Sequence, residues 1–303
     1  VVLLEEMGRH MLPGPYFSTV VMGGMSIMEA GTEDQKQEYL PRIAEGQIIV
    51  TLALNEPSGR WDAEGIQLTA DKSGDGYVLN GTKLFVPNAH VSDNLVVAAR
   101  TGGGDTDISL FIVSSQAKGL TQNLLKTIAS DRQSEVVFQN VEVPSSALLG
   151  EKNTGWSTIE KVLQWGAIGK CAEMSGGGQE VLDMTVEYAK QRTQFGRPIG
   201  TFQAIQHHCA NMATDVEGAK FITYQAAWKL SEGLPAEREV AMAKAWVSEA
   251  YRRVCALGHQ SHGAIGFTKE HNMQLYSRRA KAAELAFGDA DLHLEKVAEI
   301  IGL

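Results

Sequence analysis

The feature that most constrains this chain is a run of helical periodicity that begins near Gly155 and continues almost to the C-terminus. Four segments carry it, at about 155–191, 201–231, 236–262 and 270–301, and the last is interrupted near Gly288. In the second segment apolar residues return at helical spacing, at Ile205, Cys209, Met212, Val216 and Phe221. Helices of this length joined by short links pack as an antiparallel bundle.

The stretch before this run has a different period. Residues 47–57 form an apolar run with β-branched residues, and residues 66–88 alternate apolar and polar positions. Turns are expected at Ser73-Gly74-Asp75-Gly76 and at Asn80-Gly81, because Asp-Gly and Asn-Gly between alternating segments are strong hairpin signals. Three further strands are expected in NLVVAAR, ISLFIVSS and EVVFQNVEVP. Several short strands with regular turns predict a small barrel or sandwich.

The first 46 residues are again helical in period. Leu3, Leu4 and Met7 share one face, and Thr32 precedes acidic residues in the position of an N-cap. The chain starts inside an amphipathic pattern without an initiator Met, so we expect it to begin partway through a helical region. The predicted fold is therefore α+β and multidomain. It combines part of an N-terminal helical domain (1–46), a middle β-barrel-like domain (47–150) and a C-terminal antiparallel four-helix bundle (151–303).

Charge and composition argue against several classes of function. The net charge is −9 and no basic cluster is present, so the electrostatic attraction that drives nucleic-acid binding is missing. No apolar run reaches the ~18 residues of a membrane span, and no signal-peptide pattern is present. Cys171, Cys209 and Cys255 are widely separated without metal-type spacing and are interpreted as reduced thiols, so we expect a cytoplasmic protein.

Three links between expected elements carry residues that a loop does not need. In RTQFGRPIGTFQAIQH, residues 192–207, Arg192 either complements the C-terminus of the preceding helix or reaches a phosphate with its guanidinium fork. In QSHGAIGFTKEH, residues 260–271, two glycines allow a close backbone approach, and His262 is either a ligand or a satisfied structural residue. LNEPSGRWD, residues 54–62, follows a strand, where loops commonly hold ligands.

Taken in order, six segments resemble the acyl-CoA dehydrogenases along essentially the whole chain. They are TLALNEPSG, GTKLFVPNAHVSD, VFQNVEVPSSALLG, RTQFGRPIGTFQAIQH, HGAIGFTKEH and RRAKAAELAFGD. The resemblance implies an N-terminal helical domain, a middle β domain and a C-terminal four-helix bundle, with non-covalently bound FAD and assembly as a homodimer or tetramer. It implies α,β-dehydrogenation of an acyl-CoA thioester in fatty acid and lipid metabolism, with an electron-transferring flavoprotein as electron acceptor.

The same resemblance assigns cofactor-binding residues by matching motifs. The flavin and its ribityl arm are expected to meet Leu52, Leu54, Asn55, Phe85 and Pro87. The pyrophosphate and adenine of an FAD held mainly by another subunit are expected at Arg192, Gln194, Phe195, Gln260, His262, Gly263 and Ala264. Relatives usually have threonine where this chain has Asn55, tryptophan where it has Phe85, and threonine where it has Pro87, which cannot donate a hydrogen bond. We therefore expect altered flavin contacts, with Trp61 reshaping the pocket.

The chain lacks the family's catalytic carboxylate. In relatives a glutamate removes the substrate α-proton from one of two positions, which here are Phe287 and, counting back from Arg192, Gly166. Three carboxylates remain near these positions: Asp289, Asp291 and Glu173. Asp289 is the candidate base, because it shares the turn at Gly288. Alternatively Asp289 caps the next helix, and Glu173 pairs within the bundle.

Four functions remain open from the sequence. The leading one is an FAD-dependent acyl-CoA dehydrogenase. The others are a non-catalytic FAD-binding subunit of a heteromeric dehydrogenase, a flavin monooxygenase of the same fold, and a helical scaffold protein without flavin. Self-association is expected because the bundle carries apolar residues on more than one face, for example in AAWKL and AMAKAWV.

Overall fold

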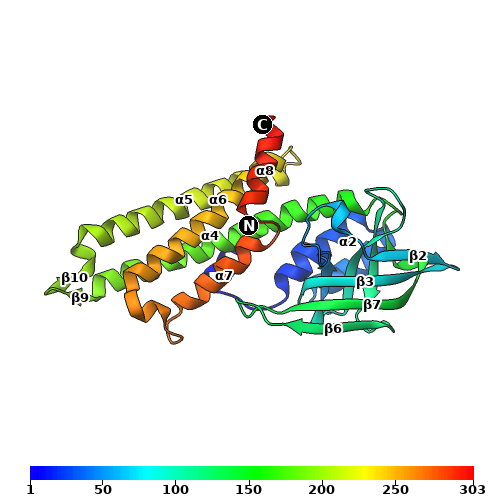
Figure 1. The fold of residues 1–303 in the computed structure, drawn as a ribbon, viewed down its shortest axis with the longest axis horizontal. Helices are drawn as coiled ribbons and strands as arrows, with labels where there is room; N and C mark the ends of the chain where they lie inside the picture. The colour runs from blue at the N-terminus through cyan, green and yellow to red at the C-terminus, as the bar shows by residue number, and fades with distance from the viewer. The chain divides into compact units, whose positions relative to one another are not determined.

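The computed structural model describes all 303 residues. They form two compact units, one of residues 1–12 and 164–303, the other of residues 13–163 (Figure 1). The long helix α4 (Gly155–Gln191) contributes residues to both.

The first unit is helical. Its other helices are α1 (Val2–Arg9), α5 (Gln203–Ser231), α6 (Glu237–His262), α7 (Met273–Leu285) and α8 (Ala290–Ile301). A short hairpin of β9 (Thr193–Gln194) and β10 (Arg197–Pro198) and the 3-10 turn η5 (Ile199–Thr201) link α4 to α5, and the 3-10 turn η6 (Gly263–Phe267) follows α6. Helix α6 packs against α5, α7 and α8. The four helical segments expected from the sequence are confirmed, and Gly288 lies in the predicted interruption, between α7 and α8.

Helix α1 docks closely on α4 through glycines. A Cβ atom at Gly176 of α4 would lie 1.8 Å from the carbonyl oxygen of Glu5, and one at Gly8 of α1 would lie 1.9 Å from that of Glu173. Glycine inside a helix costs about 1 kcal/mol relative to alanine, so these positions are explained by backbone-to-backbone contact. Leu4 and Met7 are buried as expected, whereas Leu3 is exposed, which corrects the predicted apolar face.

The second unit contains the sheet. Before it come the π-helix η1 (Phe17–Gly24), α2 (Met25–Ala30) and α3 (Glu33–Ala44). The strands are β1 (Val50–Ala53), β2 (Thr69–Ser73), β3 (Gly76–Pro87), β4 (Asn94–Arg100), β5 (Ile108–Ser114), β6 (Leu120–Leu125), β7 (Gln133–Pro144) and β8 (Leu148–Leu149). They form one sheet in the order β6-β7-β3-β2-β4-β5-β8, with β1 parallel to β4. The expected cap of α3 is confirmed, because the Thr32 hydroxyl accepts from the Gln35 N–H in a capping box.

One of the two expected turns is confirmed and the other is wrong. Ser73 pairs with Gly76, so Gly74 and Asp75 form the β2–β3 turn. Asn80 and Gly81 instead lie inside β3, where the register with β7 shifts between Leu79 and Gly81 as in a β-bulge. Gly81 has φ +145°, and a Cβ there would lie 2.8 Å from the Cα of Leu68. This glycine is required for close backbone approach rather than for a turn.

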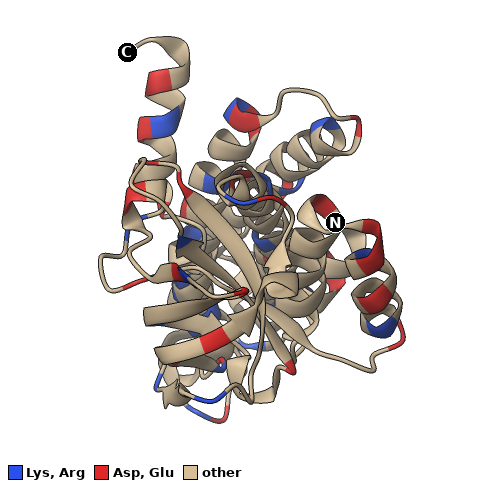
Figure 2. Cartoon of the chain, turned by 90° about the vertical axis from the view of Figure 1, so that its right-hand side faces the viewer, with Lys and Arg blue, Asp and Glu red and all other residues tan.

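Charged residues of both signs are interspersed along the ribbon, as Figure 2 shows. Several form surface ion pairs within one helix, such as Lys36 with Glu33 and Lys190 with Glu187. None of the helices combines the length and the apolar character that crossing a membrane requires. All three cysteines are free thiols.

Candidate active site and cofactor-binding segments

The turn between α7 and α8 is strained and buried. Phe287 has φ +61° and Gly288 has φ +90°; a positive φ is unusual for a bulky side chain. The Phe287 side chain is buried, and a Cβ built on Gly166 of α4 would come within 2.3 Å of its ring. The two positions at which the family resemblance predicts the base are therefore in contact, and a phenyl ring fills the space between them.

Two buried side chains hold this turn. The Nζ of Lys244, on α6, donates to Ser248 Oγ at 3.0 Å, to the Glu284 carbonyl at 2.8 Å and to the Gly288 carbonyl at 2.7 Å. Burial lowers the pKa of Lys244 to about 8. These three bonds account for all three ammonium protons. From α8, His293 Nε2 donates to the Phe287 carbonyl at 2.9 Å.

The protonation state of His293 follows from its surroundings. A carbonyl can only accept, so Nε2 carries the ring proton. Burial lowers the pKa of His293 to about 4, because a charged imidazolium would lose its hydration. The ring is therefore neutral at pH 7. Sequence reasoning missed both Lys244 and His293, since no local pattern marks a lysine on a long helix as buried.

Two of the three candidate carboxylates near the turn, Asp289 and Glu173, already have partners. Asp289 Oδ1 accepts from the Leu292 N–H at 3.0 Å and caps α8, as in the alternative considered above. Asp291 is exposed in the first turn of that helix. Glu173 pairs with Lys170 at 2.6 Å inside the bundle. The role of Asp289 as base stays a prediction. The helix cap occupies only one of its two carboxylate oxygens.

A further carboxylate, Glu284, was not singled out from the sequence. It lies one helical turn before Phe287, and its Oε1 pairs with Lys281 at 3.1 Å. Its Oε2 is buried without a hydrogen-bond partner.

In the sheet unit, the expected flavin-facing residues fall into two kinds. The side chains of Leu52 and Leu54 are buried in the core, so the main chain is what these positions offer to a ligand. Asn55 is half-buried, and its carbonyl accepts from the Leu84 N–H at 2.8 Å, which ties the two motifs together. Phe85 has φ +54° and is 55% exposed, whereas Pro87, the last residue of β3, is half-buried.

A buried ion pair between Lys83 and Glu56 stabilises the segment that carries Leu54 and Asn55. Lys83 is fully buried, and its Nζ donates to Glu56 Oε1 at 2.6 Å and to the Leu54 carbonyl at 3.0 Å. The Glu56 carboxylate also accepts from the N–H groups of Gln67 and Leu68 at 2.9 and 3.0 Å. Burial lowers the pKa of Lys83 to about 8. Glu56, Gln67 and Leu68 also line a surface cleft with Pro57, Ser58, Gly81 and Thr82.

In the helical unit, the other expected cofactor residues gather at one end of the bundle. Arg192 follows α4 directly and is exposed. Gln194, in β9, is exposed, and Phe195, at the hairpin turn, is 91% exposed with φ +52°. At the end of α6, the buried ring of His262 stacks on Tyr188 of α4 with centroids 4.5 Å apart. The remaining members, Gln260, Gly263 and Ala264, are exposed.

This end lies far from the strained turn within one chain. Gly166 and Tyr188 are separated by 22 residues of continuous α4 helix, which corresponds to about 33 Å along the axis. A ligand group bound by Arg192 therefore lies on the order of 30 Å from the contact between Gly166 and Phe287 in the same chain.

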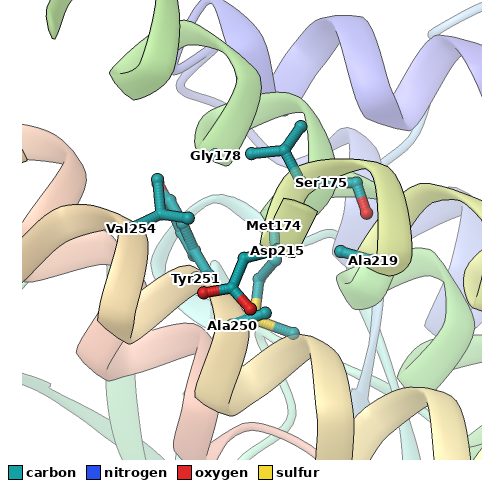
Figure 3. Close-up of a pocket in the computed structure, with 9 residues that line it drawn as sticks. Met174, Ser175, Gly178, Asp215, Ala219, Ala250, Tyr251 and Val254 are labelled. Carbon is teal, nitrogen blue, oxygen red and sulfur yellow. The ribbon is translucent and has the colours of Figure 1, made fainter. Parts of the chain in front are cut away.

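A small cavity inside the bundle belongs to neither site. Figure 3 shows it between α4, α5 and α6, lined by Met174, Ser175, Gly178, Asp215, Val216, Ala219, Ala250, Tyr251 and Val254. Its volume of about 10 Å³ is at the limit for a single water molecule. Its one ionisable carboxylate, Asp215, pairs with Arg253 at 2.7 Å. We interpret the cavity as a packing void.

The family follows from comparison with known proteins. Models of the acyl-CoA dehydrogenase N-terminal, middle and C-terminal domains match residues 1–47, 51–141 and 153–302 in series. The chain belongs to the acyl-CoA dehydrogenase family. This acyl-CoA dehydrogenase family member has the expected α+β fold, with N-terminal helices, a middle sheet domain and a C-terminal helical domain.

Curated relatives of this family member include both dehydrogenases and reductases. A 3-(aryl)acrylate reductase of Clostridium sporogenes is 35% identical over 98% of this chain and 81% of its own length. The caffeyl-CoA reductase-Etf complex subunit CarC of Acetobacterium woodii is 34% identical over 96% and 79%. The short-chain specific acyl-CoA dehydrogenase of Megasphaera elsdenii is 34% identical over 91% and 74%.

Solved structures agree with this assignment. The butyryl-CoA dehydrogenase from Megasphaera elsdenii superposes with a TM-score of 0.94 at 31% identity, covering 99% of this chain and 80% of that one. The FAD complex of PigA superposes with a TM-score of 0.91 at 26% identity, covering 95% and 77%. The chain is accordingly a flavoprotein oxidoreductase of the acyl-CoA dehydrogenase family with FAD as its cofactor.

The residues of this chain fit an FAD cofactor. An exposed aromatic ring at Phe85 suits a flat flavin, and the exposed guanidinium of Arg192 suits a pyrophosphate. Gly263 has φ +65°, and a Cβ at this position would meet nothing within 4 Å, so the backbone is open to a ligand there.

Proposed function

We propose that this chain dehydrogenates an acyl-CoA thioester between its α and β carbons, or runs the same reaction in reverse. The observation that carries the proposal is the turn at Phe287 and Gly288, which is held buried and left-handed against Gly166 by Lys244 and His293. Strain of this kind persists where the surrounding structure over-determines it, and it is concentrated at active sites.

Each residue group has a defined part in this reaction. FAD, when bound, accepts or supplies the two electrons. Main-chain groups at Leu52 and Leu54, with Asn55, bind the flavin, and the exposed Phe85 ring packs beside it. Pro87 contributes shape but no N–H donor. Asp289 is our candidate for the group that exchanges the substrate α-proton, through the carboxylate oxygen that does not cap α8.

Self-association completes the cofactor site in this proposal. Arg192, Gln194 and Phe195 hold the pyrophosphate and adenine, with Gln260, His262, Gly263 and Ala264 along the same cofactor. Tyr188, on which His262 of this group stacks, lies about 33 Å along α4 from Gly166, so these residues serve an FAD whose flavin reacts in a neighbouring copy. Exposed Trp228 and Trp246 on α5 and α6 support a dimer or tetramer.

The electron partner is proposed from the relatives. One of them is named as a subunit of a reductase-Etf complex, and one solved neighbour carries the name of an electron transferring flavoprotein. We therefore propose such a flavoprotein as the electron partner. We keep fatty acid metabolism in the cytoplasm as the proposed setting, as expected from the sequence.

A second function is favoured by one specific observation. The phenyl ring of Phe287 fills the space beside Gly166, and Asp289 is engaged in a helix cap. A chain of this kind could bind FAD without catalysing α-proton transfer, as the non-catalytic subunit of a heteromeric dehydrogenase.

Anaerobic flavin titration separates these functions. Purified protein is titrated with straight, branched and aromatic acyl-CoAs, and the reduced protein with the corresponding 2-enoyl-CoAs. Bleaching by an acyl-CoA, or recovery of colour with an enoyl-CoA, supports the proposed enzyme. A yellow protein that responds to neither supports the non-catalytic subunit, and a colourless protein that does not take up FAD contradicts both.

A further inference from the structure

Lys244 combines three features that packing alone does not require. It is fully buried, it is the C-terminal anchor of α7 through the Glu284 carbonyl, and it is bonded to Gly288 on the far side of Phe287. Helices commonly end with a glycine in the left-handed conformation, which satisfies the last carbonyls locally. Here the C-cap residue Ala286 is extended and the left-handed residue that follows is Phe287 rather than glycine. The Glu284 carbonyl, in the last turn of α7, is bonded by Lys244 instead.

Through these bonds Lys244 determines the position of one side chain, that of Phe287. Because its Nζ donates to both the Glu284 and the Gly288 carbonyls, Lys244 holds the two ends of the segment 284–288 close together. Phe287 is thereby kept at positive φ with its ring against Gly166. His293 bonds the Phe287 carbonyl as well, so side chains from α6 and α8 both hold this turn.

We propose that Lys244 is a positioning residue for the acyl-CoA reaction. It holds the Phe287 side chain against Gly166 and so sets the shape of the pocket that receives the acyl group. The identity of this ligand rests on the proposed function above. Lys244 does not act as the base, because all three of its protons are donated to oxygen atoms and the nitrogen has no lone pair to offer.

The test compares Lys244→Met with Lys281→Met in FAD-loaded protein. Lys281 lies near the same turn but is half-exposed and bonds only the Glu284 side chain, so it controls for the loss of a nearby charge. The first readout is backbone amide hydrogen exchange across residues 286–290, without substrate. We expect exchange there to rise by about 10-fold or more in Lys244→Met and to stay unchanged in Lys281→Met.

The second readout is acyl selectivity, taken as the ratio of kcat/KM for a branched and a straight acyl-CoA. Phe287→Ala alone is expected to change this ratio by about 10-fold, the usual scale for reshaping an apolar pocket. In the Lys244→Met background the same substitution should have little further effect, because the side chain is no longer held in place. If Lys244 has only a structural role, the effects of Lys244→Met and Phe287→Ala on this selectivity ratio should be additive.

Several results would overturn the proposal. They are unchanged amide exchange in Lys244→Met, an equal rise in Lys281→Met, or an undiminished effect of Phe287→Ala in the double variant. If Lys244→Met does not fold, Lys244→Gln replaces it, since the amide retains two donors without the charge, and the same criteria apply. A wild type that reacts with no acyl-CoA refutes the proposed function instead, and the exchange readout still decides whether Lys244 holds the turn.

Discussion

The buried His293 should make this protein less stable in acid. His293 is 4% exposed and is neutral in the folded state, with a pKa lowered to about 4 from the ordinary 6.5. Between these two values the unfolded chain binds a proton that the folded chain does not. The free energy of unfolding therefore falls as the pH falls through this window and is unaffected above it.

The size of the effect follows from the two pKa values. At 1.36 kcal/mol per pH unit, the full gap corresponds to roughly 3 kcal/mol below pH 4, and the loss between pH 7.5 and pH 5 is about 2 kcal/mol. His293→Gln should remove this contribution of about 2 kcal/mol, because glutamine does not titrate and its amide can still donate to the Phe287 carbonyl. A smaller acid loss should remain, because burial also lowers the pKa of His259 and His262.

Urea unfolding followed by tryptophan fluorescence measures the difference. Wild type, His293→Gln and the control His10→Gln are compared at about pH 7.5 and about pH 5. His10 is largely exposed near Glu6, so its replacement should leave the acid loss in place. If His293→Gln loses as much stability on acidification as the wild type, the burial of a neutral His293 is not its source.

Three further substitutions test the site. Arg192→Ala should reduce the FAD content after gel filtration and weaken assembly; a variant with stoichiometric FAD and an unchanged oligomer by light scattering would contradict the assigned phosphate contact. Asp289→Asn keeps a good helix cap, so bound FAD should survive while acyl-CoA-driven flavin reduction falls by roughly 10²; unchanged reduction would rule Asp289 out as the base. Lys83→Met leaves the Glu56 carboxylate buried without its cation and should cost about 3–5 kcal/mol in thermal or urea unfolding, and adding Glu56→Gln should recover part of this loss. A Lys83→Met variant as stable as the wild type would show that this ion pair does not stabilise the segment around Leu54 and Glu56.

Much of the architecture was determined by the sequence alone. The helix at 155–191 was predicted with its observed ends, and the break at Gly288 was expected, because long amphipathic segments and glycine breaks are local signals. The six motifs identified the family, since their order along the chain is far more specific than any one of them. The Asn80-Gly81 turn was wrong because a local hairpin signal was overridden by the close approach of Leu68 to Gly81 in the folded sheet.

Only the tertiary structure decided how the site is held together. Gly166 and Phe287 are 121 positions apart in the sequence, and their contact depends on how α4 packs against the turn after α7. Lys83 and Lys244 look like ordinary surface lysines in the sequence, since lysine is almost never fully buried unless its ammonium is paired. Their burial follows from carbonyl and carboxylate partners that other segments supply: Leu54 and Glu56 for one, Glu284 and Gly288 for the other. A periodic pattern reports which face of an element is apolar, but it carries no information about which distant oxygen atoms that face will meet.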